Sequence, residues 1–120
     1  MSLGLFELSS ISERRIDQML DPDRRAIRPF LAENAGLESG LMIVQYAAAS
    51  SLGELHGHTT PRSAFSTTTS AGQEDHVSMA ATASWNLFNA IQRCSEVLAC
   101  EAFVAYRALK IIATPSSTCV

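Results

Sequence analysis

The chain has 120 residues, of which 47% are hydrophobic and 18% charged, and its formal net charge at pH 7 is −3. This length predicts a single domain with one modest core. The acidic balance argues against nucleic-acid binding, and no apolar run approaches the roughly 20 residues that a membrane span needs.

The cysteines and the first residues bear on where the protein works. Cys94, Cys100 and Cys119 form no CxxC pair, which argues against a disulfide framework and predicts a reducing, cytoplasmic setting. Residues 1–9 lack the charged and apolar regions of a signal peptide. We interpret them as a possible leader that is not part of the folded domain.

Two helices are predicted in the first half of the chain. The first covers residues 10–20, where Ser10 and Glu13 have capping-box spacing, and Asp21-Pro22 ends it. The second covers residues 38–54, which are rich in good helix formers. Its apolar residues occur all around the helix, so we expect it to be buried in a larger domain or between subunits.

The second half begins with a Ser/Thr-rich loop over residues 57–74, longer than most connections in compact domains. A long helix is predicted over residues 75–112, which contain no proline or glycine. At about 1.5 Å per residue it is on the order of 50 Å long, more than a compact globule of this size can cover. The helix therefore needs neighbours, and we expect a frayed tail over residues 115–120.

The sequence SAGQEDHVSM, residues 70–79, joins the loop to the long helix and admits three interpretations. Glu74 and Asp75 are typical of the first turn of a helix, where carboxylates oppose the helix dipole. A metal site is the second interpretation, but adjacent residues diverge by about 100° on a helix. Its ligands would come from Glu54, His56, His58, Glu74, Asp75 and His76.

The third interpretation is nucleophilic catalysis, with Ser70 or Cys94 beside His76 and Asp75. Such triads are defined by geometry, and the sequence contains no GxSxG elbow to support one.

The same decapeptide closely resembles the signature of the histidine ammonia-lyase family, the aromatic amino-acid lyases that carry a methylidene-imidazolone (MIO) electrophile. Two further blocks, SISERRIDQMLDP and NAGLESGLMIVQYAAAS, occur in the family's order, and the resemblance covers about residues 10–110. It implies an all-α fold in which this chain is part of the central long-helix bundle of a homotetramer.

The resemblance implies that the parent enzyme eliminates ammonia from a small aromatic amino acid, giving urocanate where that substrate is L-histidine. Glu74 matches the family glutamate that faces the substrate, as a catalytic and substrate-binding residue, and Gln73 matches its polar neighbour. Gln-Glu-Asp-His favours histidine, because phenylalanine lyases have Asn-Gln-Asp at this point. The resemblance gives no role to a metal, and Tyr46 and Tyr106 are expected to serve packing.

The MIO electrophile forms from Ala-Ser-Gly, which this sequence does not contain: Ser70-Ala71-Gly72 has another order, and Glu38-Ser39-Gly40 another first residue. We therefore expect a single helical fragment of a larger lyase that is inactive alone. Arg62 and Phe65 depart from the family's loop and leave a tyrosine or phenylalanine lyase, or an aminomutase, open as the parent. A non-catalytic helical oligomerisation module and a small metal-binding protein also remain alternatives.

Overall fold

The structure is a computed structural model that describes residues 1–25 and 27–113. Its elements are α1 (Ser2–Leu20), α2 (Pro22–Arg25), the 3₁₀ turn η1 (Pro29–Leu31), α3 (Met42–Gly57), the 3₁₀ turn η2 (Ser70–Gly72) and α4 (Ala80–Ala113). The described residues form no strand beyond two isolated bridges, which confirms the predicted all-α class. Among the described residues, no helix combines the length and apolar character needed to cross a membrane.

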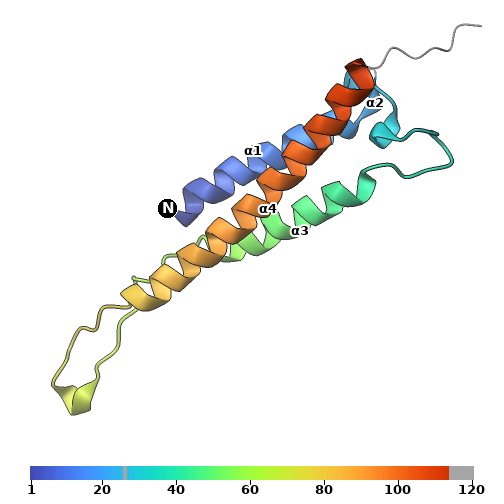
Figure 1. Cartoon of the computed structure of the whole chain (residues 1–120). Coiled ribbons are helices and arrows are strands. Elements are labelled where there is room, and N and C mark those ends of the chain that lie inside the picture. Colours follow the sequence, from blue (N-terminus) through green and yellow to red (C-terminus); the bar gives the residue numbers. More distant parts are fainter. Residues whose placement is uncertain (26, 114–120) are drawn as a thin grey trace, which may run out of the picture.

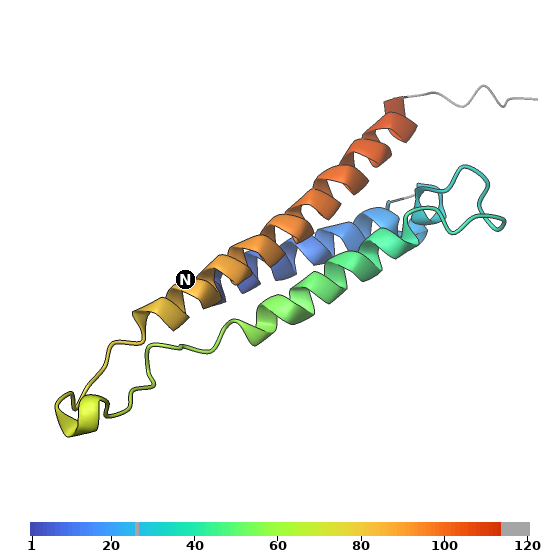
Figure 2. The same cartoon turned by 60° about the horizontal axis from the view of Figure 1, so that its bottom comes forward.

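Three long helices lie side by side: α4 packs against both α1 and α3, and α1 also packs against α3 (Figure 1). The chain runs in the same direction in α1 and α4 and in the opposite direction in α3, as Figures 1 and 2 agree. The molecule is a rod of 83 × 23 × 18 Å with a radius of gyration of 20.9 Å. It is therefore far more extended than a compact domain of this length, for which about 13 Å is usual.

The core is a narrow seam between the helices. Its buried members are Ile16, Leu20, Leu31, Ala48, Val97, Val104 and Ala108, and a smaller cluster contains Leu55, Ala90 and Cys94. Full burial of one Leu, Ile or Val side chain contributes about 1.5–3 kcal/mol, so this seam is what holds the three helices together.

A polar contact adds to the seam between α1 and α4. The Glu101 carboxylate accepts hydrogen bonds from Arg15 and from the buried hydroxyl of Ser12. The hydrogen bond from Arg15 is the main reason that the pKa of Glu101 lies below its usual value, with burial opposing the shift and Ser12 reinforcing it. The ionised carboxylate therefore helps to hold α4 in register with α1.

The first helix is longer than predicted, because α1 begins at Ser2 and not at Ser10. Ser10 and Glu13 thus lie inside the helix, and the predicted capping box is wrong. Residues 2–9, which are compatible with a leader in the sequence, form the first turns of α1, and Ser9 is fully buried. The predicted end is confirmed, since Asp21 leaves the helical region immediately before Pro22.

The second helix begins at Met42, four residues later than predicted, and ends at Gly57 instead of Glu54. Gly40 explains the late start, because its φ of +50° is left-handed and cannot belong to a right-handed helix. The Leu41 N–H donates to the carbonyl of Phe30 at 2.8 Å and so fastens the loop to η1.

The long helix begins at Ala80 and not at the predicted Asp75, and it continues to Ala113. Residues 75–79 cannot join it in this structure, because both backbone groups of Val77 are bonded to the Ser66 hydroxyl across the loop. The 34 residues of α4 span about 50 Å, the length expected from the sequence. The tail predicted over residues 115–120 lies outside the described residues.

Much of the apolar surface is left uncovered within this chain. Tyr46 on α3 and Tyr106 on α4 are 66% and 58% exposed. The packing role expected for both is therefore not met within this chain. On α3 only Ala48 and Leu55 are buried, so the described residues of this chain do not provide the all-round burial that the apolar pattern predicts. The exposed faces agree with the prediction from the sequence that these helices need further neighbours.

Candidate functional site

The residues singled out in the sequence lie on an arm, which we define as residues 58–79. The arm leaves the end of α3, turns at η2 and returns to the start of α4, and it projects beyond the bundle (Figure 2). Gln73 and Glu74 lie at its tip, and both are exposed. The motif therefore stands clear of the three-helix seam.

The tip is a tight turn closed by Thr69 and Glu74. The Thr69 N–H donates to the Glu74 carbonyl at 3.1 Å, and the Glu74 N–H donates to the Thr69 carbonyl at 3.3 Å. The Thr69 hydroxyl also donates to Oε2 of the Glu74 carboxylate at 3.2 Å. These contacts fix both the backbone and one carboxylate oxygen of Glu74 relative to Thr69.

Further contacts join the outgoing and returning segments of the arm below the tip. The Ser66 hydroxyl accepts from the Val77 N–H at 2.9 Å and donates to the Val77 carbonyl at 3.0 Å. At the base, Asn86 Nδ2 donates to the His58 carbonyl at 2.7 Å, and its Oδ1 lies 2.9 Å from His58 Nδ1. The long Ser/Thr-rich loop is thus held at its base, its middle and its tip.

The helix-start interpretation of Glu74 and Asp75 is wrong. Four residues separate Asp75 from Ala80, and the first turn of α4 contains no acidic residue. The carboxylate of Glu74 is used in the turn with Thr69 instead of opposing a helix dipole.

The metal and nucleophile interpretations find no support in the geometry of the described residues. No group of three or more His, Cys, Asp or Glu side chains there is placed to hold an ion. His58 is engaged with Asn86, and the His56 ring lies 5.2 Å from that of Phe6. Cys94 is buried in the bundle, whereas His76 is exposed on the arm, so the structure does not bring them together as a catalytic pair.

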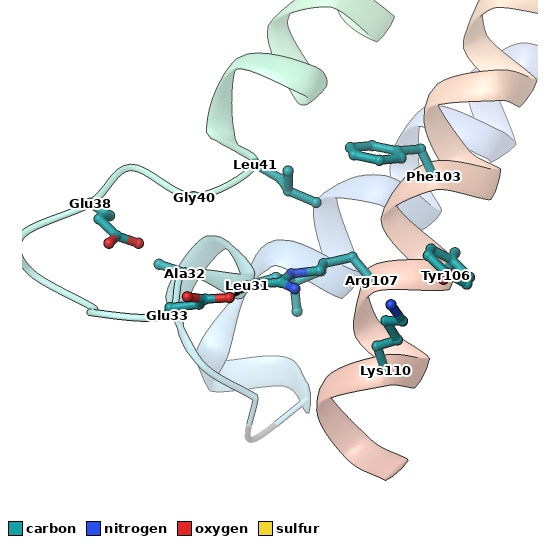
Figure 3. A pocket seen from close by; sticks show the side chains of 10 residues that line it. All are labelled: Leu31, Ala32, Glu33, Glu38, Gly40, Leu41, Phe103, Tyr106, Arg107 and Lys110. Atoms are coloured by element: carbon teal, nitrogen blue, oxygen red, sulfur yellow. Dashed lines mark hydrogen bonds and ion pairs between the residues drawn. The ribbon is translucent and has the colours of Figure 1, made fainter. Parts of the chain in front are cut away.

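A separate cavity that the sequence did not predict lies at the other end of the bundle (Figure 3). It has a volume of about 380 Å³ and is bounded by the loop before α3 and by the last turns of α4. Arg107 Nη2 donates to Glu33 Oε1 at 2.7 Å across it. A hydrogen bond from Asn34 is the main reason that the pKa of the exposed Glu38 is lowered. None of the residues that line this cavity belongs to the arm, so the cavity is separate from the site at the tip.

Comparison with known proteins bears on the origin of the arm. Residues 1–119 match the family model for aromatic amino acid lyases. Histidine ammonia-lyase of Streptomyces coelicolor is 44% identical over 112 residues, covering 92% of this chain and 22% of the relative. That of Bacillus mycoides is 42% identical over 123 residues, covering 98% of this chain and 24% of the relative. The chain therefore spans less than a quarter of the length of these relatives.

Solved structures agree with this match. Histidine ammonia-lyase of Trypanosoma cruzi superposes with a TM-score of 0.80 at 37% identity, over 92% of this chain and 22% of that protein. Phenylalanine aminomutase of Pantoea agglomerans superposes with a TM-score of 0.75 at 26% identity, over 98% of this chain and 23% of that protein. The resemblance drawn from the three sequence blocks is thus confirmed, and the chain belongs to the aromatic amino acid lyase family.

Proposed function

We propose that this chain is one part of an ammonia-lyase that converts L-histidine to urocanate, and that Glu74 is its contribution to the active site. The observation that carries the proposal is the similarity to relatives named histidine ammonia-lyases, at 42–44% identity. Glu74 fits the role because it is exposed at the tip of the arm and bonded there to Thr69. A carboxylate held away from its own bundle is available to a site completed by other segments.

The chemistry of a carboxylate suits an imidazole substrate. Glu74 Oε1 is available to accept the imidazole N–H, while Oε2 accepts the Thr69 hydroxyl. A hydrogen bond to a charged group contributes about 1.5–3 kcal/mol, enough to discriminate against a substrate ring without an N–H. Gln73 stands beside it as a second polar group that binds the substrate.

The MIO electrophile does not fit the residues of this chain. The sequence contains no Ala-Ser-Gly, and Ser70-Ala71-Gly72 is occupied in the turn of η2. In our proposal a segment outside this sequence supplies the electrophile, and the 120-residue chain alone has no lyase activity. We place the enzyme in the cytoplasm, as the cysteine pattern predicts.

A second candidate function is assembly without catalysis. It is favoured by the large apolar side chains that α4 leaves exposed, namely Trp85, Phe88, Ile91, Leu98, Phe103, Tyr106, Leu109 and Ile112. Large exposed apolar surfaces mark contacts with other chains or segments.

In our proposal this face packs within a homo-oligomer, a tetramer in the parent enzyme. Sizing with light scattering tests it, since a monomeric full-length protein is incompatible with it.

The deciding experiment determines the mass and reading frame of the native polypeptide and assays it for urocanate and for cinnamate-type product. We expect the full-length protein to release urocanate from L-histidine and the isolated chain to be silent. Glu74→Gln should lower kcat/KM for L-histidine about ten- to hundredfold, while Glu7→Gln, at an exposed site on α1, leaves it unchanged. Release of cinnamate without urocanate would overturn the assignment of L-histidine as the substrate. An unchanged kcat/KM in the Glu74→Gln variant would overturn the proposed role of Glu74.

A further inference from the structure

Thr69 contacts Glu74 through three groups at once, which no other residue of the arm does within the described part of the chain. Its N–H and carbonyl pair with the backbone of Glu74 at 3.1 and 3.3 Å. Its hydroxyl donates to Glu74 Oε2 at 3.2 Å. The backbone pair fixes where the Glu74 side chain begins, and the hydroxyl fixes where it ends.

The turn between these two residues is strained. Ser70 and Ala71 both have a φ of +54°, a left-handed conformation that disfavours any residue with a Cβ, and Gly72 follows at +87°. Such a conformation persists where surrounding contacts impose it, and strained backbone of this kind clusters at functional sites. Here the Thr69–Glu74 pair closes the turn, and the Ser66–Val77 bonds fasten the arm just below it.

We propose that Thr69 is a positioning residue, whose hydroxyl holds the Glu74 carboxylate so that Oε1 faces the substrate. The proposal rests on the proposed function of Glu74. A glutamate has three side-chain torsions, and an unheld one would have to be ordered each time the substrate binds. With Oε2 occupied by the Thr69 hydroxyl, the carboxylate is oriented before the substrate arrives.

The test compares three variants of the full-length protein in the urocanate assay. Thr69→Val keeps the shape and removes the hydroxyl donor, and we expect kcat/KM for L-histidine to fall about five- to tenfold. Thr69→Ser restores the donor and should recover most of that loss. Thr68→Val is the matched control, because Thr68 is exposed and makes no hydrogen bond among the described residues.

A double-mutant cycle with Glu74→Ala separates positioning from a general effect on the fold. If Thr69 acts through Glu74, Thr69→Val should cause no further loss once the carboxylate is gone. Losses that multiply would overturn the proposal, as would a Thr69→Ser variant no better than Thr69→Val. The melting temperature of each variant shows whether the protein remains folded.

The same data distinguish the two proposals. If Glu74→Ala leaves kcat/KM unchanged, the proposed role of Glu74 is wrong, and positioning by Thr69 fails with it. If Glu74→Ala lowers kcat/KM and Thr69→Val does not, the role of Glu74 stands and the positioning role is wrong. If Thr69→Val unfolds the protein, Thr69→Ser still decides, because serine keeps the hydroxyl donor. A folded Thr69→Ser variant that has lost its kcat/KM would show that the hydroxyl does not provide the positioning.

Discussion

Replacing Gly40 with alanine tests how the loop before α3 is fastened to η1. A Cβ at this position would lie 2.4 Å from the Phe30 carbonyl oxygen and 2.9 Å from the Ala32 nitrogen, and both are backbone atoms. The left-handed φ of +50° adds roughly 1–2 kcal/mol for a residue with a Cβ. Relief of the overlap would also weaken the Leu41–Phe30 hydrogen bond, worth about 0.5–1.5 kcal/mol. We expect Gly40→Ala to lower the free energy of unfolding by roughly 1.5–3.5 kcal/mol.

Gly36→Ala is the matched control, because Gly36 also has a positive φ, +93°, but a Cβ there would meet nothing within 4 Å. Its φ is farther than that of Gly40 from the left-handed minimum near about +57°, so its backbone penalty is at least as large. Any excess loss at Gly40 is therefore due to the close approach of η1. Urea unfolding followed by far-UV circular dichroism measures both variants. An equal or smaller loss for Gly40→Ala would refute the reasoning.

Three further predictions concern the seam, the α1–α4 contact and the arm. Ile16→Ala should lower the free energy of unfolding of the chain by about 2–5 kcal/mol, whereas Ile11→Ala, at a site 55% exposed on the same helix, should change it by less than about 0.5 kcal/mol. Because the folded-state pKa of Glu101 is lowered, its stabilisation is present above the ordinary value of 4.5 and is lost as the pH falls through the folded pKa. Glu101→Gln should therefore reduce stability near neutral pH but make little difference in acid, as unfolding at several pH values will show; a pH-independent difference would contradict this. Ser66→Ala should speed hydrogen exchange of the Val77 amide about tenfold without altering exchange in α4, and an unchanged Val77 rate would contradict the latch.

The sequence predicted the three long helices, but it predicted neither their first residues nor the short helix α2, and two of the late helix starts have a cause visible in the structure. Gly40 adopts a left-handed φ and delays α3 to Met42, which helix propensity alone does not reveal. The helix α4 begins at Ala80 instead of the predicted Asp75. The reason is that both the N–H and the carbonyl of Val77 are hydrogen-bonded to the hydroxyl of Ser66, eleven residues earlier in the chain. A contact between residues so far apart cannot be inferred from local pattern.

The arm shows the same limit for the site. The family motif identified Gln73 and Glu74 as candidates, and the structure brings Thr69 against Glu74. Within a Ser/Thr-rich run, nothing in the sequence distinguishes Thr69 from Thr67 or Thr68. The difference arises from the left-handed turn at Ser70 and Ala71, which folds the chain back so that Thr69 faces Glu74.

The division between a three-helix bundle and a projecting arm explains why the candidate site of this chain lies outside its core. A carboxylate needs water or donors around it, and the seam offers aliphatic side chains instead. The arm leaves Glu74 exposed to solvent, while hydrogen bonds from Thr69 to Glu74 and between Ser66 and Val77 hold the tip together. In our proposal this carboxylate becomes buried only when other segments of the enzyme and a substrate N–H close around it. If the proposed function is right, the apolar faces of α3 and α4 and the exposed glutamate have one cause, because both are surfaces that other segments of the enzyme cover.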